Sequence, residues 1–415
     1  MSQQVIWTIF LASILCMLLR PRGITEAWWV CAGAILLVAV RLISVRQAAQ
    51  AVRDGFDVYL FLAGMMILAE LARAERVFDW VADIAARHAK GSPARLFVLV
   101  YLVGTIVTAL LSNDATAVVL TPAVLAVVRR AKVDPKPYLL ACAFIANAAS
   151  FVFPISNPAN LVVFGQHIPP LRAWLSIFLL PSLASVLITF LCLRWLSRRR
   201  LRGGFQGNLQ PVLLSTEGKF ALAGLLFAAA ALIFSSALGL SLGAPTCGAA
   251  MVAMAVVAWR NRSVVPRIEK GVSWSVLPLV AGLFVIVAAL QNAGLLRLGL
   301  AGLQALSRTS TQLAKVSAAF AVALLSNGMN NLPVGLMGGA AIAVPHAQES
   351  GIVAHAILIG VDLGPNLSVT GSLATILWLI ALRHEQVEIT AWEFFDVGMV
   401  AMPLALIASL LVLRG

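Results

Sequence analysis

The stretch that decides the fold is ALLSNDATAVVLTP, residues 109–122, and its first five letters return in ALLSNGMNNLPVG, residues 323–335. In both places a Ser-Asn pair interrupts a long apolar run, and in the first copy the acid Asp114 follows the pair. Polar groups in the middle of such a run are costly unless protein or a water-filled space surrounds them. The two copies therefore predict a polar site that is built twice within a hydrophobic chain.

The composition predicts an all-α polytopic membrane protein. Of the 415 residues, 61% are hydrophobic and 11% are charged, and the mean hydropathy is +0.95. Apolar runs of about 20 residues recur, which is the length that a helix needs to cross a bilayer, and the alternation of a β-barrel is absent. The first run, 5–19, is followed by the basic stretch 20–22 rather than by a small-residue cleavage site. It is predicted to be a retained helix and not a signal peptide.

The net charge of +13 comes from basic residues in short loops between the apolar runs. The strongest cluster, at 198–200, lies at the start of the longest polar linker, 197–216. Positive loops favour the cytoplasmic side, so we expect a cytoplasmic linker and two periplasmic termini in a bacterial inner membrane. This distribution explains the charge without a nucleic-acid partner.

Two segments, 94–130 and 312–346, are too long for one span and too short for two, and each has Ser-Asn at its centre. They are predicted to be re-entrant helical hairpins. The segments that follow them, 137–165 and 351–380, contain internal Pro and Gly and are predicted to be broken transmembrane helices.

The order of hairpin and broken helix occurs twice, which predicts two repeats, 1–196 and 217–415, on either side of the linker 197–216. A hairpin returns to the side that it entered, so each repeat has an odd number of crossings and the second must be inverted. Inverted repeats whose broken helices meet at the bilayer centre are typical of secondary transporters. The hairpins and broken helices would form a transport domain, and the other helices a scaffold.

Each half supplies one carboxylate to the predicted midplane, Asp114 and Asp362, and we interpret both as proton-coupling groups. The alternative is that each one only caps a half-helix. Amide and hydroxyl side chains surround them without any Lys or Arg, which suits a small neutral hydroxide better than an anion. The residues predicted to bind substrate are Ser112, Asn113, Thr116, Ser156, Asn157, Asn160, Ser326, Asn327, Asn330, Asn331, Thr370 and Ser372.

Other chemistry has little support in the sequence. The five cysteines are scattered without metal-site spacing, so we expect no metal and no cofactor, and Cys142 is the cysteine closest to the site along the chain. The charged run 70–87 is predicted to be a helix end followed by an interfacial amphipathic helix. No GxxxxGK[ST] loop occurs, which indicates a transporter driven by the proton gradient rather than an enzyme with its own ATPase site.

Four stretches carry a resemblance to a known family: LLSNDATAVVLTPAV (110–124), FIANAASFVFPISNPANLVV (144–163), LLSNGMNNLP (324–333) and IGVDLGPNLSVTGSLATILWL (359–379). With these, the chain resembles the ArsB arsenite permeases of the ion transporter superfamily. The resemblance implies proton-driven export of trivalent arsenic and antimony, as neutral hydroxides, from the cytoplasm. Some such permeases associate with an ArsA-type ATPase. The chain departs from the pattern at Asn147, where ArsB relatives often have an acid.

Several alternatives stay open at this stage. A sodium/proton antiporter, or a carrier of silicic acid or a carboxylate, would belong to the same superfamily. The sodium-coupled carriers typically have Ser-Asn-Thr at both tips, whereas this chain has Asp114 and Gly328 in the third place. An intramembrane enzyme would use Asp114 and Asp362 as a catalytic pair, although no familiar catalytic motif supports it. A passive channel for neutral solutes is the last alternative.

Overall fold

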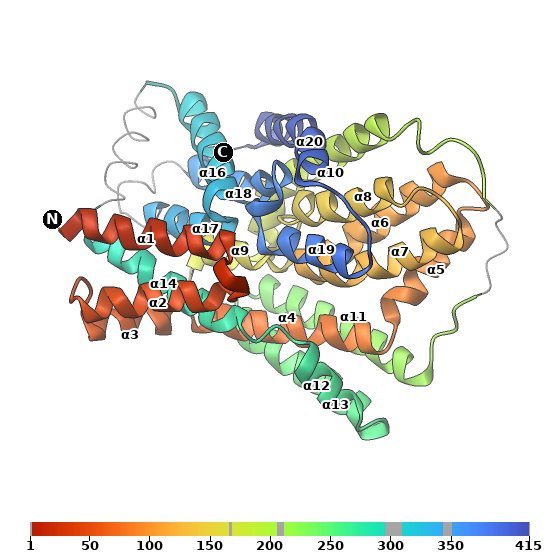
Figure 1. Cartoon of the computed structure of the whole chain (residues 1–415), viewed down its shortest axis with the longest axis horizontal. Helices are drawn as coiled ribbons and strands as arrows, with labels where there is room; N and C mark the ends of the chain where they lie inside the picture. Colours follow the sequence, from red (N-terminus) through yellow and green to blue (C-terminus); the bar gives the residue numbers. More distant parts are fainter. Residues whose placement is uncertain (1, 166–167, 206–210, 295–308, 343–350, 415) are drawn as a thin grey trace.

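The computed structural model describes residues 2–165, 168–205, 211–294, 309–342 and 351–414, and these residues form helices and loops without a β-strand (Figure 1). The all-α prediction is confirmed. Within the described residues, five helices are long and apolar enough to cross a membrane, or six if the pair 45–54 and 56–74, bent by 46°, counts as one span. The five are Pro93–Leu110, Leu171–Leu196, Thr216–Ala237, Val264–Asn292 and Ala391–Val412.

The first half of the chain begins with a group of four helices and continues into the first hairpin and its broken helix. Its helices are α1 (Ser2–Leu19), α2 (Glu26–Ala39), α3 (Val45–Asp54), α4 (Phe56–Ala74), α5 (Val77–His88), α6 (Pro93–Leu110), α7 (Thr121–Arg130), α8 (Lys136–Ala148), α9 (Pro158–Phe164) and α10 (Leu171–Leu196). Local sequence explains several starts. The Ser92 side chain accepts a hydrogen bond from the Arg95 N–H at the start of α6, and Pro93 occupies the first helical position, where no N–H is needed.

The second half repeats this order. Its helices are α11 (Thr216–Ala237), α12 (Gly243–Arg260), α13 (Val264–Gly271), α14 (Val276–Asn292), α16 (Thr311–Met329), α17 (Asn331–Ile342), α18 (Gly351–Leu363), α19 (Leu373–His384) and α20 (Ala391–Val412). Residues 206–210 of the predicted linker and 343–346 of the predicted second hairpin lie outside the described residues.

Packing between the halves follows a reciprocal pattern. Helix α2 packs on α14 while α4 packs on α12, α3 contacts α14 while α13 contacts α4, and α10 packs on α20. Within each half, α1 packs on α2 and α11 on α12, and α6 packs on α8 and α16 on α18. Exchanging the halves converts each of these contacts into another one, except the contact between α10 and α20, which is converted into itself. The pattern supports the two predicted repeats, whose boundaries and inversion stay predictions.

The first hairpin reverses direction at the Ser-Asn-Asp sequence. Helix α6 ends at Leu110, and after the turn the chain continues through a π-helical segment, Ala115–Leu120, into α7. The Thr108 hydroxyl donates to the Thr116 hydroxyl at 2.8 Å, and the Thr116 hydroxyl donates to the Gly104 carbonyl at 3.4 Å. The returning segment therefore runs back along α6. π-helical turns are frequent at functional sites.

The second hairpin turns at Asn330, which joins α16 to α17 with a φ of 74°. With a ψ of 150°, this conformation lies outside the left-handed helical region and is adopted mainly by glycine. Its side-chain oxygen accepts from the Leu332 N–H at 3.3 Å, which caps the start of α17. The two helices pack on each other.

Both predicted helix breaks are present. The first lies between α8 and α9 and contains the short 3-10 turn Pro154–Ser156. The second lies between α18 and α19 and contains two such turns, Gly364–Asn366 and Val369–Gly371. Helix α17 packs on α9 and α18, and these elements meet near the middle of the molecule (Figure 1). The hairpins and breaks of the two halves are thus brought into contact.

Candidate functional site

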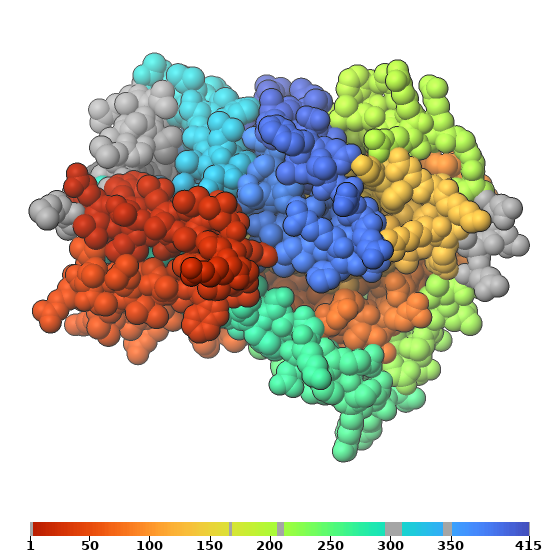
Figure 2. Space-filling model, viewed as in Figure 1, coloured from red at the N-terminus to blue at the C-terminus, as the bar shows by residue number. Residues whose placement is uncertain are grey.

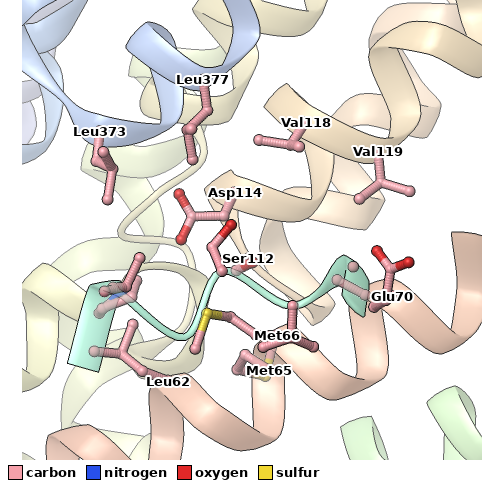
Figure 3. A pocket seen from close by; sticks show the side chains of 16 residues that line it. Leu62, Met65, Met66, Glu70, Ser112, Asp114, Val118, Val119, Leu373 and Leu377 are labelled. Carbon is pink, nitrogen blue, oxygen red and sulfur yellow. The ribbon is translucent and has the colours of Figure 1, made fainter. Parts of the chain in front are cut away.

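A cavity lies beside the tip of the first hairpin and encloses about 660 Å³ of empty space, mouth included. We call it the Asp114 cavity. Its walls come from α4, the hairpin, the start of α9, the loop before α14, and α19 (Figure 3). The lining residues are Leu62, Met65, Met66, Ala69, Glu70, Ser112, Asp114, Val118, Val119, Pro158, Gly271, Val272, Ser273, Val276, Leu373 and Leu377.

The turn before Asp114 is capped by its neighbours and not by Asp114. The Ser112 hydroxyl accepts from the Ala115 N–H at 3.1 Å, and the Asn113 side-chain oxygen accepts from the Asp114 N–H at 2.9 Å. Within the part of the chain that the structure describes, the Asp114 carboxylate makes no hydrogen bond, and it points into the space between α19 and α4 (Figure 3). The carboxylate therefore faces the cavity without a protein partner among the described residues.

Asp362 occupies a different environment. It is 0% exposed at the end of α18, and its Oδ1 accepts a 2.6 Å hydrogen bond from Asn157 Nδ2. Asn157 Oδ1 in turn accepts from the Ala159 N–H at 3.0 Å and so caps α9. Oδ2 of Asp362 has no partner among the described residues. Asp362 connects the two broken helices through Asn157, and it does not line the Asp114 cavity.

A second amide pair crosses between the same two helices. Asn147 Nδ2 donates to Asn366 Oδ1 at 3.0 Å, and Asn366 Nδ2 donates to the Phe144 carbonyl at 3.1 Å. All three residues are buried. Asn147 Oδ1 finds no partner among the described residues. Buried amides need several partners, and here the two breaks provide them for each other.

The tip of the second hairpin is tied to the second break. Asn327 Nδ2 donates to the Gly364 carbonyl at 2.9 Å, and Asn327 Oδ1 accepts from the Ser368 hydroxyl at 2.6 Å. The Thr370 hydroxyl donates to the Asn327 carbonyl at 2.8 Å. Ser372 accepts from the Thr375 N–H at 3.1 Å and caps α19. The second copy of the Ser-Asn sequence thus holds its own broken helix in place.

The structure divides the predicted substrate residues into three groups. Ser112, with Asp114, lines the Asp114 cavity, and Asn330 lines a narrow cleft, with about 310 Å³ of empty space if its open mouth is included, that shares Leu373 with it. Asn157, Asn327, Thr370 and Ser372 join the breaks and tips as described above. The remaining residues are buried, or bound to nearby backbone or side chains, or both: Asn113, Thr116, Ser156, Asn160, Ser326 and Asn331.

Sequence analysis missed the contribution of α4. Met65, Met66 and Glu70 form the wall opposite Asp114, but α4 is hydrophobic around its whole circumference and offers no face that marks a site. Cys142 is buried in α8 and lines none of the described cavities. Among the described residues, no group of His, Cys, Asp and Glu is arranged to hold a metal ion.

Proteins of similar sequence are named as membrane pumps or transporters. The chain is 26% identical over 408 residues to the arsenical pump membrane protein of Escherichia coli, covering 94% of each chain. It is 26% identical over 405 residues to the Yersinia enterocolitica protein of the same name, covering 95% of this chain and 94% of that one. It is also 28% identical over 435 residues to an uncharacterized transporter of Mycobacterium tuberculosis, covering 98% and 97%. The resemblance to arsenite permeases is confirmed.

The solved structure of the YdaH transporter of Alcanivorax borkumensis has a similar fold, with a TM-score of 0.58 at 14% identity, and the match covers 93% of this chain and 96% of that one. Apolar helices and membrane transporter relatives together identify a multi-pass membrane protein. The family model described as citrate transporter matches residues 9–364. Because this match spans most of the sequence, the chain belongs to the citrate transporter family, CitMHS.

Proposed function

We propose that this protein exports trivalent arsenic and antimony, as their neutral hydroxides, in exchange for protons. The relatives named arsenical pump membrane protein support the choice of substrate. In this proposal the protein lies in the inner membrane of a bacterium with its basic linker in the cytoplasm. The Asp114 cavity is the substrate site, and alternating access comes from movement of the hairpins and broken helices against the scaffold.

The observation that carries the proposal is the chemistry of the cavity wall. Two carboxylate residues, Asp114 and Glu70, and two hydroxyl residues, Ser112 and Ser273, line it, together with apolar and thioether side chains. Of the described lining residues, none is Lys or Arg. A citrate anion would be repelled by Asp114 without a compensating cation, whereas a neutral trihydroxide meets both donors and acceptors. The cavity thus favours an uncharged solute over the carboxylate that gives the family its name.

The two acids have separate roles in this proposal. Asp114 lines the cavity and exchanges its proton with the solution in the cavity. Its carboxylate is available for this because it has no hydrogen-bond partner among the described residues. Asp362 links the broken helices through Asn157, so a change in its charge would alter how those helices hold together. A carboxylate near a bilayer centre costs about 2.5–3.5 kcal/mol, which favours a functional reason for keeping two.

The experiment is arsenite uptake into inverted membrane vesicles with and without an uncoupler. Wild-type vesicles should accumulate arsenite only while a proton gradient exists, and Asp114→Asn and Asp362→Asn should each abolish the accumulation. Asp134→Asn is the matched control, because Asp134 pairs with Arg200 outside the cavity. Full activity in both test variants would show that neither acid is needed for transport. Arsenite uptake that the uncoupler does not reduce would indicate a passive channel.

One observation favours a second candidate, a sodium/proton antiporter. Asp362 Oδ2 and Asn147 Oδ1 are buried oxygens without donors among the described residues, and Na⁺ prefers such hard oxygen ligands. Sodium-dependent proton flux in vesicles that contain no arsenite would support this candidate over the proposed one.

A further inference from the structure

The Asp114 cavity has a second cavity as its neighbour. This one encloses about 930 Å³ of empty space, mouth included, and we call it the vestibule. Four residues line both cavities: Glu70, Val118, Val119 and Gly271. The vestibule is also lined by Arg73, Arg76, Phe78, Asp79, Pro122, Ala123, Ala381, His384 and Glu385. The shared residues lie at the boundary, which we call the partition, between the Asp114 cavity and a chamber lined by charged residues.

The vestibule lies on the same side of the molecule as the basic linker. Glu385, which lines it, pairs with Arg129 at 2.7 Å near the end of α7. The next residue, Arg130, pairs with Asp83, and Asp83 also accepts from the Val212 N–H of the linker at 3.1 Å. A solute would therefore enter the vestibule from the predicted cytoplasmic side.

Glu70 is the charged part of the partition. Its side chain is only 8% exposed, and Arg73, which is 55% exposed, binds it with two hydrogen bonds of 2.8 and 2.5 Å. A buried carboxylate is costly unless it is paired, so Arg73 stabilises the buried position of Glu70 from the vestibule side. An ion pair between two exposed side chains one turn apart on a helix contributes little to stability, but here the acid is enclosed.

Gly271, at the end of α13, provides the space for this carboxylate. A Cβ atom at Gly271 would lie 2.0 Å from Glu70 Oε1 and 2.2 Å from its Cδ, a separation that atoms cannot adopt. The backbone of Gly271 therefore contacts the acid directly, and any side chain there would displace it. The Glu70 carboxylate is held between α4 and the loop before α14.

The same face of α4 continues along the Asp114 cavity. Leu62, Met66 and Glu70 follow one another at four-residue intervals, so they lie on one face of the helix. At 1.5 Å per residue this row spans about 12 Å. Glu70 lies at the end of the row that also lines the vestibule, and Figure 3 shows Glu70 and Leu62 on opposite sides of Met65 and Met66.

We propose that Glu70, held by Arg73 against Gly271, is the gate between the vestibule and the Asp114 cavity, through which the solute enters. This inference rests on the proposed function, because it takes the Asp114 cavity as the solute site. When Arg73 releases Glu70, the carboxylate is free to leave the partition and the two cavities join. The gate is then a carboxylate whose position depends on one exposed arginine.

The test measures access to a cysteine placed behind the gate. Met66→Cys lies on the wall of the Asp114 cavity, and its modification by a membrane-impermeant methanethiosulfonate is followed by peptide-resolved mass spectrometry, which separates it from the five native cysteines. In inverted vesicles we expect Glu70→Ala to raise the modification rate at least tenfold. Glu70→Gln preserves the size of the side chain but removes the charge that pairs with Arg73, so it should also raise the rate, by at least threefold.

A second reporter shows whether the effect is local. Asp54 lines a cavity at the other end of α4, so both reporters are also compared in detergent-solubilised protein, where the reagent reaches both ends, and there the modification rate of Asp54→Cys should not respond to Glu70→Ala. An unchanged rate at Met66→Cys, or equal increases at both reporters, would overturn the gate. Modification requires no arsenite, so its outcome is independent of the transport assay. Absent arsenite export would refute the proposed function alone, and an unchanged modification rate would refute the gate alone.

Discussion

The bond between Asn157 and Asp362 offers the sharpest test of how the two broken helices are joined. Asn157 has two functions, because its Nδ2 donates to Asp362 Oδ1 at 2.6 Å and its Oδ1 caps α9 through the Ala159 N–H. Asn157→Ser should preserve the cap, since Ser is a good N-cap residue, while it removes the bond to Asp362. The two functions can therefore be separated in one variant.

The expected magnitude follows from the burial of the pair. Hydrogen bonds to charged groups contribute about 1.5–3 kcal/mol in proteins, whereas double-mutant cycles in a membrane protein average about 0.6 and reach about 1.7 kcal/mol. Asn157 is 2% exposed and Asp362 is 0% exposed, and the bond is short, so we expect a value near the upper end of the membrane range. About 1.5 kcal/mol corresponds to roughly a tenfold change in the unfolding equilibrium.

The assay is a double-mutant cycle on equilibrium unfolding in mixed micelles with increasing sodium dodecyl sulfate. Asn157→Ser should lower the free energy of unfolding by about 1.5 kcal/mol in the wild-type background. In the Asp362→Leu background, where the acceptor is absent, the same change should cost less than about 0.5 kcal/mol. Equal costs in the two backgrounds would show that Asn157 acts through its cap alone and would refute the link between the helices.

Three further perturbations test the surrounding structure. Gly364→Ala should lower the yield of monodisperse protein in size-exclusion chromatography, because its Cβ would lie 2.6 Å from the backbone of α16. Asp83→Asn should speed tryptic cleavage of the basic linker about tenfold, since the Asp83 carboxylate binds two arginines and the Val212 N–H, and a lost interaction of about 1.4 kcal/mol corresponds to that factor. Asn160→Ala should lower the free energy of unfolding by about 2 kcal/mol in the micelle titration, because one amide satisfies three backbone carbonyls of the first break.

Each of these has a matched control. Gly248→Ala should behave as wild type, since a Cβ there meets nothing within 4 Å. Asp79→Asn removes a partly exposed acid that pairs with Arg76 and with no other basic residue among those the structure describes, and it should leave cleavage of the linker unchanged. Asn261→Ala changes an amide in the loop after α12, and a loss of stability equal to that of Asn160→Ala would contradict the role assigned to the first break.

Much of the architecture could be predicted from local sequence. The length of the apolar runs determines which segments form long helices, because a membrane offers no partner for an unpaired backbone. Proline and glycine at 154, 158, 364 and 365 mark the two breaks, and the first Ser-Asn pair marks the first hairpin turn. The second pair, Ser326-Asn327, lies inside α16, and that hairpin turns three residues later, at Asn330. These signals act within a few residues of the chain, so they are visible without the fold.

The cavity could not be predicted in the same way. The sequence assigned the same proton-coupling role to Asp114 and Asp362, but only Asp114 lines the cavity, while Asp362 is enclosed behind Asn157. Glu70 was assigned to a helix end because nothing in its neighbourhood along the chain distinguishes it from a surface charge. Its burial depends on Gly271, which is distant in sequence.

The sequence by itself determined where helices begin, break and reverse, because those events depend on backbone hydrogen bonds and on the few residues that supply or remove them. Only the tertiary structure decided which polar side chains share a space. Helices that are apolar on every side, such as α4, reveal no inward face in their pattern, and the face that lines the cavity is selected by packing against partners from the other half of the chain.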